Sequence, residues 1–176
     1  MPFKTTLIYS ESLIKKAVLS FWWRTVGVKF LIALALIIFG LVQGYRAGDQ
    51  SWLMGVLVSV LFFGVAIIVA LYVVHYKGAI KRFKAMGEPT ATLTITSETC
   101  TFVSGAGAAT LPWSAITEVW QFSDYWLLFY SKAQFSILPL ANLSSDIQDF
   151  IVQHVNDAGG KICIWKHTIK FRKKIT

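Results

Sequence analysis

The longest run without a charged side chain extends over residues 50–76, and it limits what this chain can fold into more than any other feature. A helix rises about 1.5 Å per residue, so this run is longer than the roughly 30 Å hydrocarbon core of a bilayer. We therefore predict a transmembrane helix at residues 52–76. Hydrophobic residues make up 55% of the 176-residue chain, and this share favours the same class because soluble domains have about 45–50%.

A second, shorter apolar run precedes it. Residues 30–45 carry no charge and form a helix about 24 Å long, and residues 26–29 extend it to about 30 Å if the stem of Lys29 reaches the headgroups. We therefore predict a first transmembrane helix at residues 26–45, joined to the second by an external turn at residues 46–51. A cleaved signal peptide is the competing interpretation, and the long preceding arm with its Glu11 argues against it.

Basic side chains are distributed unevenly around the two predicted spans. The N-terminal residues up to Lys29 and the segment directly after the second span, residues 77–88, together contain nine Lys or Arg, whereas the turn between the spans contains Arg46 alone. Lys and Arg gather on the cytoplasmic side of membrane proteins, so we predict a multi-pass protein of the cell inner membrane with both termini cytoplasmic, its N-terminal arm comprising residues 1–25. The nine are Lys4, Lys15, Lys16, Arg24, Lys29, Lys77, Lys81, Arg82 and Lys84.

Small residues recur on both predicted spans. Gly40 and Gly44 form a GxxxG motif, and Gly55 and Ser59 repeat its spacing on the returning helix. Such residues allow helix backbones to approach closely in a bilayer. Packing within the hairpin is the simpler interpretation, and a homodimer through Gly40 and Gly44 is the alternative. Neither span contains a carboxylate, which disfavours a transporter or pump because ion pathways need ionisable groups.

The second helix is predicted to continue beyond the bilayer as a basic extension at residues 77–88. Tyr76, Ile80 and Phe83 repeat at helical spacing beside a stripe of lysines, and Gly87 is a typical residue at a helix C-terminus. Cations at this place bind anionic lipid headgroups, and they are also the ordinary positive-inside signal. The candidate lipid contacts on the extension are Lys77, Lys81, Arg82 and Lys84.

Residues 89–160 change to the period-two pattern of β-strands. Ala91, Leu93 and Ile95 alternate with threonines, and an amphipathic helix with a capping box at Ser145–Gln148 closes the region. The expected fold class is α+β, with a two-helix transmembrane hairpin followed by a small antiparallel β-roll that one C-terminal helix closes. Five further strands are predicted at residues 99–104, 108–113, 115–122, 125–131 and 134–138.

Two motifs in this β region carry a resemblance. The stretch LPWSAITEV contains a PW-x-x-I step, and ILP ends a predicted strand near residue 139. Together with the two apolar helices, these motifs resemble the bacterial YcxB-like family of membrane proteins. The resemblance covers nearly the whole chain and implies a C-terminal domain similar to pleckstrin-homology (PH) rolls, although Leu140 stands where the family often has a basic residue. The family-motif residues are Pro112, Trp113, Ile116 and Pro139.

The Pro112–Trp113 step also has a physical explanation. Proline lacks the N–H donor of a sheet ladder, so Pro112 is expected where a strand ends and the chain turns a corner. Trp113 then supplies a large apolar side chain whose indole N–H needs a partner when it is buried. A structural corner is the expected role, and a ligand or peptide groove lined by Trp113 is the alternative.

Residues 161–176 are basic and aromatic, with six Lys or Arg and no acid. This mixture suits an anionic membrane surface, and a solvated basic tail is an equally good interpretation. RNA binding has no motif, and the net charge of +8 does not indicate nucleic acid because basic runs flank an acidic middle. The candidate lipid contacts in this tail are Trp165, Lys170, Arg172, Lys173 and Lys174.

No combination of residues indicates catalysis. Cys100 and Cys163 lack the spacing of a zinc site and are expected to be buried free thiols, and GAGA lacks the context of a dinucleotide fingerprint. We therefore expect no enzyme, no cofactor and no metal. The leading hypothesis is a regulatory or scaffolding membrane protein whose cytoplasmic domain binds a protein partner or lipid headgroups, and a membrane-surface enzyme or an accessory subunit of a transport complex is the alternative.

Overall fold

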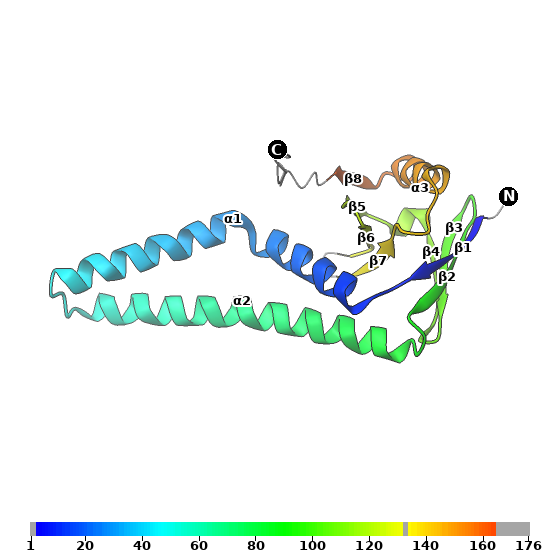
Figure 1. The fold of residues 1–176 in the computed structure, drawn as a ribbon. Helices are drawn as coiled ribbons and strands as arrows, with labels where there is room; N and C mark the ends of the chain where they lie inside the picture. The colour runs from blue at the N-terminus through cyan, green and yellow to red at the C-terminus, as the bar shows by residue number, and fades with distance from the viewer. Residues whose placement is uncertain (1–2, 132–133, 165–176) are drawn as a thin grey trace, which may run out of the picture. The chain divides into compact units, whose positions relative to one another are not determined.

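The computed structural model describes residues 3–131 and 134–164, which form an α+β protein with two long apolar helices (Figure 1). The helices are α1 (Glu11–Arg46), α2 (Trp52–Ala85) and α3 (Ser145–Asp157). The strands are β1 (Phe3–Ile8), β2 (Thr90–Ile95), β3 (Thr99–Ser104), β4 (Gly107–Pro112), β5 (Glu118–Gln121), β6 (Tyr125–Phe129), β7 (Phe135–Pro139) and β8 (Lys161–Ile164).

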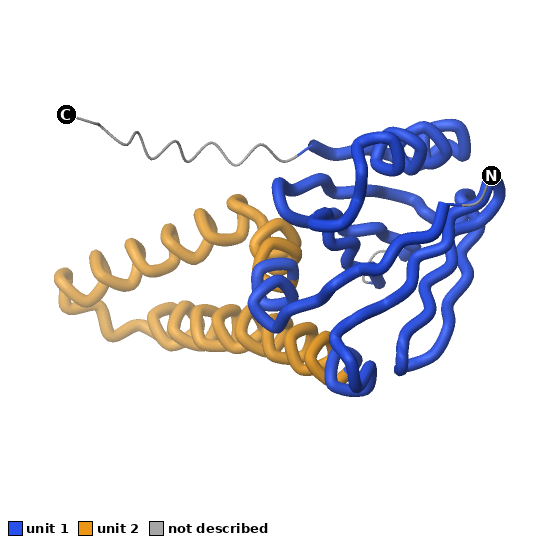
Figure 2. Tube along the Cα trace, turned by 45° about the vertical axis from the view of Figure 1, so that its right-hand side comes forward, with its two compact units in different colours: residues 1–17, 82–176 blue, residues 18–81 orange. Residues whose placement is uncertain are grey.

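The chain divides into two compact units (Figure 2). Residues 18–81 form one of them, which we call the hairpin unit, and residues 1–17 together with 82–176 form the other, the β unit. The β unit is therefore discontinuous in sequence, because the hairpin unit is inserted between its first and second strands.

The first sheet of the β unit has the order β1-β2-β3-β4, and all its neighbouring strands are antiparallel. β1 pairs with β2 along its whole length, from Phe3 opposite Ile95 to Ile8 opposite Thr90. Residues 1–25 are predicted to form an arm outside the domain of residues 89–160, whereas β1 completes the first sheet of that domain. The physical reason is the alternation of apolar and exposed side chains along FKTTLI, which suits a half-buried strand.

The second sheet has the order β7-β6-β5-β8, so the strands form two sheets rather than one antiparallel meander. β5, β6 and β7 are antiparallel neighbours, but β8 runs parallel to β5, with Lys161 opposite Glu118. Helix α3 precedes β8 and supplies the crossover that a parallel pair requires. The first four residues of the predicted tail are thus a strand, and residues 165–176 lie outside the described part.

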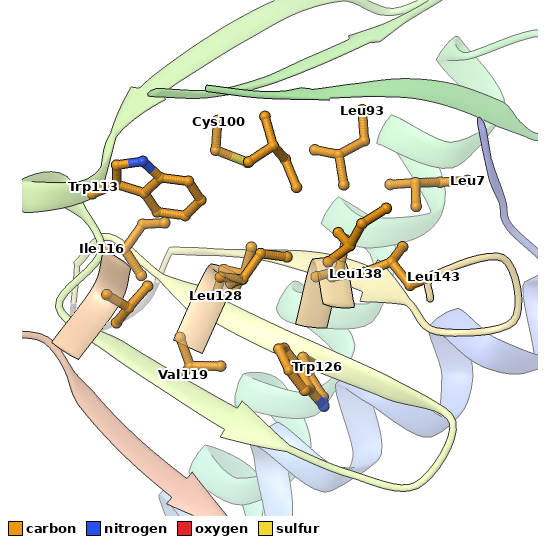
Figure 3. Packing of buried hydrophobic residues seen from close by; sticks show 14 residues of the cluster. Leu7, Leu93, Cys100, Trp113, Ile116, Val119, Trp126, Leu128, Leu138 and Leu143 are labelled. Atoms are coloured by element: carbon orange, nitrogen blue, oxygen red, sulfur yellow. The ribbon is translucent and has the colours of Figure 1, made fainter. Parts of the chain in front are cut away.

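The core of the β unit lies between the two sheets and α3 (Figure 3). Leu7, Leu93 and Cys100 of the first sheet point toward Leu128 and Leu138 of the second. This burial of apolar side chains is the main force that holds the unit together. The other buried members of the cluster are Ile95, Trp113, Ile116, Val119, Trp126, Leu143, Ile147, Ile151 and Val155.

The N-cap of helix α3 lies one residue before the predicted capping box. Ser144 is the N-cap, and its Oγ accepts a hydrogen bond from the N–H of Ile147 at 3.4 Å. The predicted box at Ser145–Gln148 was therefore displaced by one position. At the other end, Gly159 has a φ of 84°, and a Cβ added to Gly160 would lie 2.7 Å from the carbonyl oxygen of Ile116. Only glycines fit this turn from α3 into β8.

Helix α1 is longer than the span predicted at residues 26–45, because it begins at Glu11. Gly27, with a φ of 71° and a ψ of 150°, is not helical and divides α1 into two pieces. Helix α2 begins at the predicted residue, continues through the basic extension to Ala85, and is followed by Gly87 with a φ of 71°. That conformation is typical of the residue after a helix C-terminus.

The hairpin unit contains an aromatic cluster formed by both helices. The indole Nε1 of Trp22 donates a hydrogen bond to the carbonyl oxygen of Ile68 at 2.9 Å, and the Trp22 ring meets the Tyr72 ring edge-on. Phe21 packs edge-on against His75, with ring centroids 4.8 Å apart. Both α1 and α2 are long and apolar enough to cross a membrane, and their most apolar windows contain no buried residue.

Candidate functional site

The corner predicted at Pro112 and Trp113 is present. Pro112 ends β4, and Trp113 begins a short 3₁₀ helix that leads toward β5. The Trp113 side chain is only 5% exposed, and its Nε1 donates a hydrogen bond to the carbonyl oxygen of Thr96 at 3.1 Å. The indole thus has the partner that its burial requires. Trp113 is a core residue at a corner, and little of its side chain is left to line a groove.

The remaining family-motif residues are structural as well. Ile116 is buried in the core cluster, and Pro139 is buried at the end of β7 opposite Tyr125. After Pro139, the Leu140 N–H donates to the carbonyl oxygen of Asp124 at 3.1 Å, so Leu140 is fixed against the turn before β6. The motif therefore specifies how the two sheets connect and pack, and it positions no reactive group.

The GAGA stretch also has a packing explanation. It forms the turn between β3 and β4, where Gly107 has a φ of 126°. A Cβ on Gly105 would collide with the carbonyl oxygen of Met86. The glycines allow a tight turn and a close backbone approach.

The basic extension of α2 is the most exposed candidate site. Lys77, Lys81, Arg82 and Lys84 are all exposed, and among the described residues no salt bridge joins any of them to an acid. Unpaired cations on one helix end can interact with anionic lipid headgroups. The second group of candidate lipid contacts, Trp165, Lys170, Arg172, Lys173 and Lys174, lies outside the described residues.

Burial raises the pKa of two side chains among the described residues of the β unit. Burial raises the pKa of the Cys100 thiol to about 12, so the thiol stays protonated at neutral pH and is a poor nucleophile. Burial, together with the neighbouring Cys100, also raises the pKa of the Tyr9 hydroxyl above its usual value. Tyr9 donates instead to the carbonyl oxygen of Ile137 at 2.9 Å, which is a structural role.

The second cysteine is less buried. Cys163 on β8 donates its S–H to Oε1 of Glu118 on the neighbouring β5, with the sulfur 3.0 Å from the oxygen. Both cysteines are free thiols, as predicted, but only Cys100 is buried as expected, because Cys163 is partly exposed. Within the described residues, no group of three or more His, Cys, Asp or Glu is arranged to hold a metal ion.

The small residues of the hairpin unit face different surroundings. A Cβ on Gly44 would lie 2.5 Å from Sδ of Met54, and one on Gly64 would lie 3.2 Å from Cδ2 of Leu34, so both glycines allow close approach of the other helix. Gly40 and Gly55 have no atom within 4 Å of such a Cβ. Gly44 therefore serves packing within the hairpin. The homodimer stays a prediction, and of its two glycines only Gly40 has free space beside it.

An apolar groove of about 810 Å³ lies between the helices of the hairpin unit. Leu34 and Ile37 of α1 and Gly55, Ser59 and Phe63 of α2 are among its lining residues. Its single hydroxyl, on Ser59, already donates to the carbonyl oxygen of Gly55 at 2.8 Å. The groove consequently offers apolar contact and no chemistry.

Strand β1 was not predicted from the sequence. The signal was present, because Phe3, Thr5, Leu7 and Tyr9 alternate with Lys4, Thr6 and Ile8 at the period of a strand. What the sequence could not show is that β1 pairs with β2, from which α1 and α2 separate it.

Comparison with known proteins gives one similarity. Residues 95–155 match the model of a protein family described as YcxB-like protein. The matched region runs from the end of β2 to the end of α3 and includes the Pro112–Trp113 corner and Pro139. No curated protein and no solved structure matches the chain.

Proposed function

We propose, from the match of residues 95–155 to the YcxB-like family model and from the two apolar helices, that this chain is an inner-membrane protein whose cytoplasmic PH-like domain binds a protein partner or lipid headgroups in a regulatory or scaffolding role. The observation that carries the proposal is the insertion of an apolar hairpin between β1 and β2. A folded domain attached through two adjacent strands is suited to presenting a binding surface beside a bilayer.

The pairing of β1 with β2 supports the proposed topology. Ile8 lies opposite Thr90, and the Tyr9 N–H donates to the carbonyl oxygen of Pro89 at 2.8 Å. The chain before α1 and the chain after α2 must then be on the same side of the membrane. The excess of Lys and Arg in these regions favours the cytoplasmic side.

The order of elements supports a PH-like roll. Two sheets enclose one core, and α3 contributes Ile147, Ile151 and Val155 to it. This agrees with a β-roll closed by a C-terminal helix. Strand β8, which follows that helix, was not expected.

The exposed cations of α2 support lipid contact. Each Lys or Arg near an anionic surface contributes about 1 kcal/mol of attraction, so Lys77, Lys81, Arg82 and Lys84 together favour anionic headgroups. The same charges explain membrane orientation, and the two roles are compatible.

Reporter fusions test the topology. A reporter active only in the cytoplasm is expected to work when fused before Phe3 and after residue 176, and to be inactive when inserted beside Arg46. Activity at Arg46, or opposite results for the two termini, would contradict the proposal.

Lipid preference is tested with the purified full chain. The native protein should retain anionic lipid over neutral lipid, and the double variant Lys81→Gln/Lys84→Gln should retain less. The matched control Lys4→Gln/Lys161→Gln removes the same charge from strands β1 and β8. If both variants lose equal amounts of anionic lipid, net charge alone explains the preference.

A pull-down from detergent extract, with mass spectrometry, distinguishes the functional alternatives. Recovery of a cytoplasmic protein that depends on the β unit supports a binding module. Recovery of the subunits of one transporter would favour the accessory-subunit alternative.

A further inference from the structure

Strand β1 is hydrogen-bonded to a strand from which the whole hairpin unit separates it in sequence. Its partner β2 begins after α2, so the whole hairpin unit lies in sequence between two strands that are hydrogen-bonded neighbours. Helices of 36 and 34 residues return the chain to the point where β1 ended. The Tyr9 N–H bond to the Pro89 carbonyl oxygen, 2.8 Å long, closes this junction.

One face of β1 is part of the core. Leu7 has no exposed surface and belongs to the central cluster of the β unit. Phe3 packs edge-on against Phe150 of α3, with ring centroids 5.3 Å apart, and the Tyr9 hydroxyl donates to the Ile137 carbonyl oxygen of β7. β1 therefore contacts the first sheet, the second sheet and the helix that closes the roll.

The outer edge of β1 is also hydrogen-bonded. The Thr5 Oγ1 donates to the carbonyl oxygen of Asn142 at 3.1 Å, and the Asn142 Nδ2 donates to the carbonyl oxygen of Thr6 at 3.1 Å. Asn142 lies in the connection between β7 and α3. β1 thus lies between β2 on one side and this connection on the other, as an inserted strand does in β-strand addition.

We propose that the slot between β2 and Asn142 is a strand-binding site for the chain's own segment Phe3–Tyr9, and that its occupation makes folding of the β unit conditional on correct insertion of the hairpin. The proposal rests on the proposed function in one respect, namely that the hairpin crosses the bilayer twice. When it does, β1 and β2 meet on one side and the slot is filled. When only one helix inserts, β1 is on the wrong side of the membrane.

An empty slot has defined consequences. The β2 edge then presents unpaired backbone groups, and the core side chains that Leu7 covers face water. An exposed strand edge of this kind is a target for proteases and for aggregation. The topology of the fold would thereby direct incorrectly inserted chains to degradation.

The first test uses two adjacent side chains of β1 in the full-length protein in detergent. Leu7→Ala removes a side chain with no exposed surface, and the matched control Ile8→Ala removes one that is 54% exposed. Leu7→Ala should shorten the lifetime of the β unit under limited proteolysis at least tenfold, whereas Ile8→Ala should leave it near that of the native protein. Equal lifetimes for the two variants would overturn the strand-binding site.

The second test separates β1 from its slot in the membrane. A variant that lacks residues 50–76 but keeps the rest of the chain has one span. Reporters at both termini check that its ends lie on opposite sides of the membrane. Its β unit should be degraded, and co-expression of the segment Phe3–Tyr9 on the side of the β unit should restore it. The same segment with Leu7→Asp should not restore it.

A protease-resistant β unit in the one-span variant without added segment would overturn the inference. Failure of the proposed function has a different signature, because the termini of the native chain would then be found on opposite sides of the membrane. The proteolysis comparison in detergent does not depend on that result.

Discussion

The two units of this protein contain the same kinds of apolar side chain and treat them in opposite ways. In the β unit, Leu93, Leu128 and Ile151 are buried among other side chains of the unit. In the hairpin unit, Leu36 is 65% exposed and Phe62 is 68% exposed. The β unit provides its own apolar interior, whereas the hairpin unit leaves its apolar side chains exposed, as helices that cross a membrane do. Hydropathy alone therefore does not distinguish a core from a membrane span, but burial does.

The difference also affects the backbone. Away from the break at Gly27, the helices α1 and α2 satisfy their backbone polar groups within the helix, while the β unit satisfies them mainly between strands. The open edge of β4, which pairs only with β3, belongs in water. A substitution that introduces a charge should therefore be costly on the exposed apolar surface of the hairpin unit and tolerated on the exposed surface of the β unit.

The largest expected effect is loss of the core tryptophan. Trp113→Ala should destabilise the β unit by about 3–5 kcal/mol, the range for truncating a buried aromatic side chain. Thermal unfolding of the full-length protein, followed by the near-ultraviolet signal of the β unit, measures it. Trp113→Phe retains most of the apolar contact and leaves the Thr96 carbonyl oxygen without the indole donor, so its loss should be smaller. An unchanged midpoint in Trp113→Ala would place this side chain outside the core.

A charge in the middle of α2 should have the next largest effect. Phe62→Asp is expected to raise the apparent free energy of membrane insertion by about 3 kcal/mol. The fraction of chain that resists alkaline extraction from membranes measures this change. Val103→Asp is the matched control, because Val103 is 45% exposed on β3 and should tolerate the charge within about 0.5 kcal/mol. Equal behaviour of the two variants would mean that α2 is surrounded by water.

The smallest effect concerns one hydrogen bond. Ser144→Ala should destabilise the β unit by about 1 kcal/mol, because it removes the N-cap of α3. Ser145→Ala, one residue further along, should be close to neutral. Denaturant midpoints of the two variants give the comparison. A larger loss in Ser145→Ala would restore the capping box predicted from the sequence.

Much of the fold could be predicted because it depends on neighbouring residues. The predicted strand at residues 99–104 coincides with β3, and the predicted end of α2 near Gly87 agrees with its last residue, Ala85. Period-two alternation and a glycine after a helix are local signals. The Pro112–Trp113 corner was predictable for the same reason, since proline cannot join a sheet ladder.

The missed elements depend on distant partners. β1 and β8 are the edge strands added from the two ends of the β unit, and each pairs with a strand far from it in sequence. FKTTLI has the alternation of a strand, but nothing in it specifies β2 as its partner. KICI is short and directly follows two glycines, so its parallel pairing with β5 depends on the crossover through α3.

The residues of the candidate sites could be named from the sequence, but their roles could be predicted only in part. The exposure of Lys77, Lys81, Arg82 and Lys84 agrees with the expectation from their helical stripe. The family motif attracted attention as a signature, and its residues turned out to stabilise the corner and the core. A family motif can therefore specify packing without indicating chemistry.

The break in α1 at Gly27 has a consequence for where the hydrocarbon begins. A residue with a φ of 71° interrupts the i to i−4 ladder, so several carbonyl and N–H groups around it lose their helical partners. Hydrocarbon offers such groups no replacement, whereas the headgroup region supplies water. If α1 crosses a membrane, we therefore expect Gly27 to lie at the level of the headgroups and the membrane-spanning part of α1 to start at Val28. From Val28 to Arg46 the helix is about 28 Å long, close to the thickness of the apolar core of a bilayer, and in that placement Lys29 would lie one residue inside the boundary.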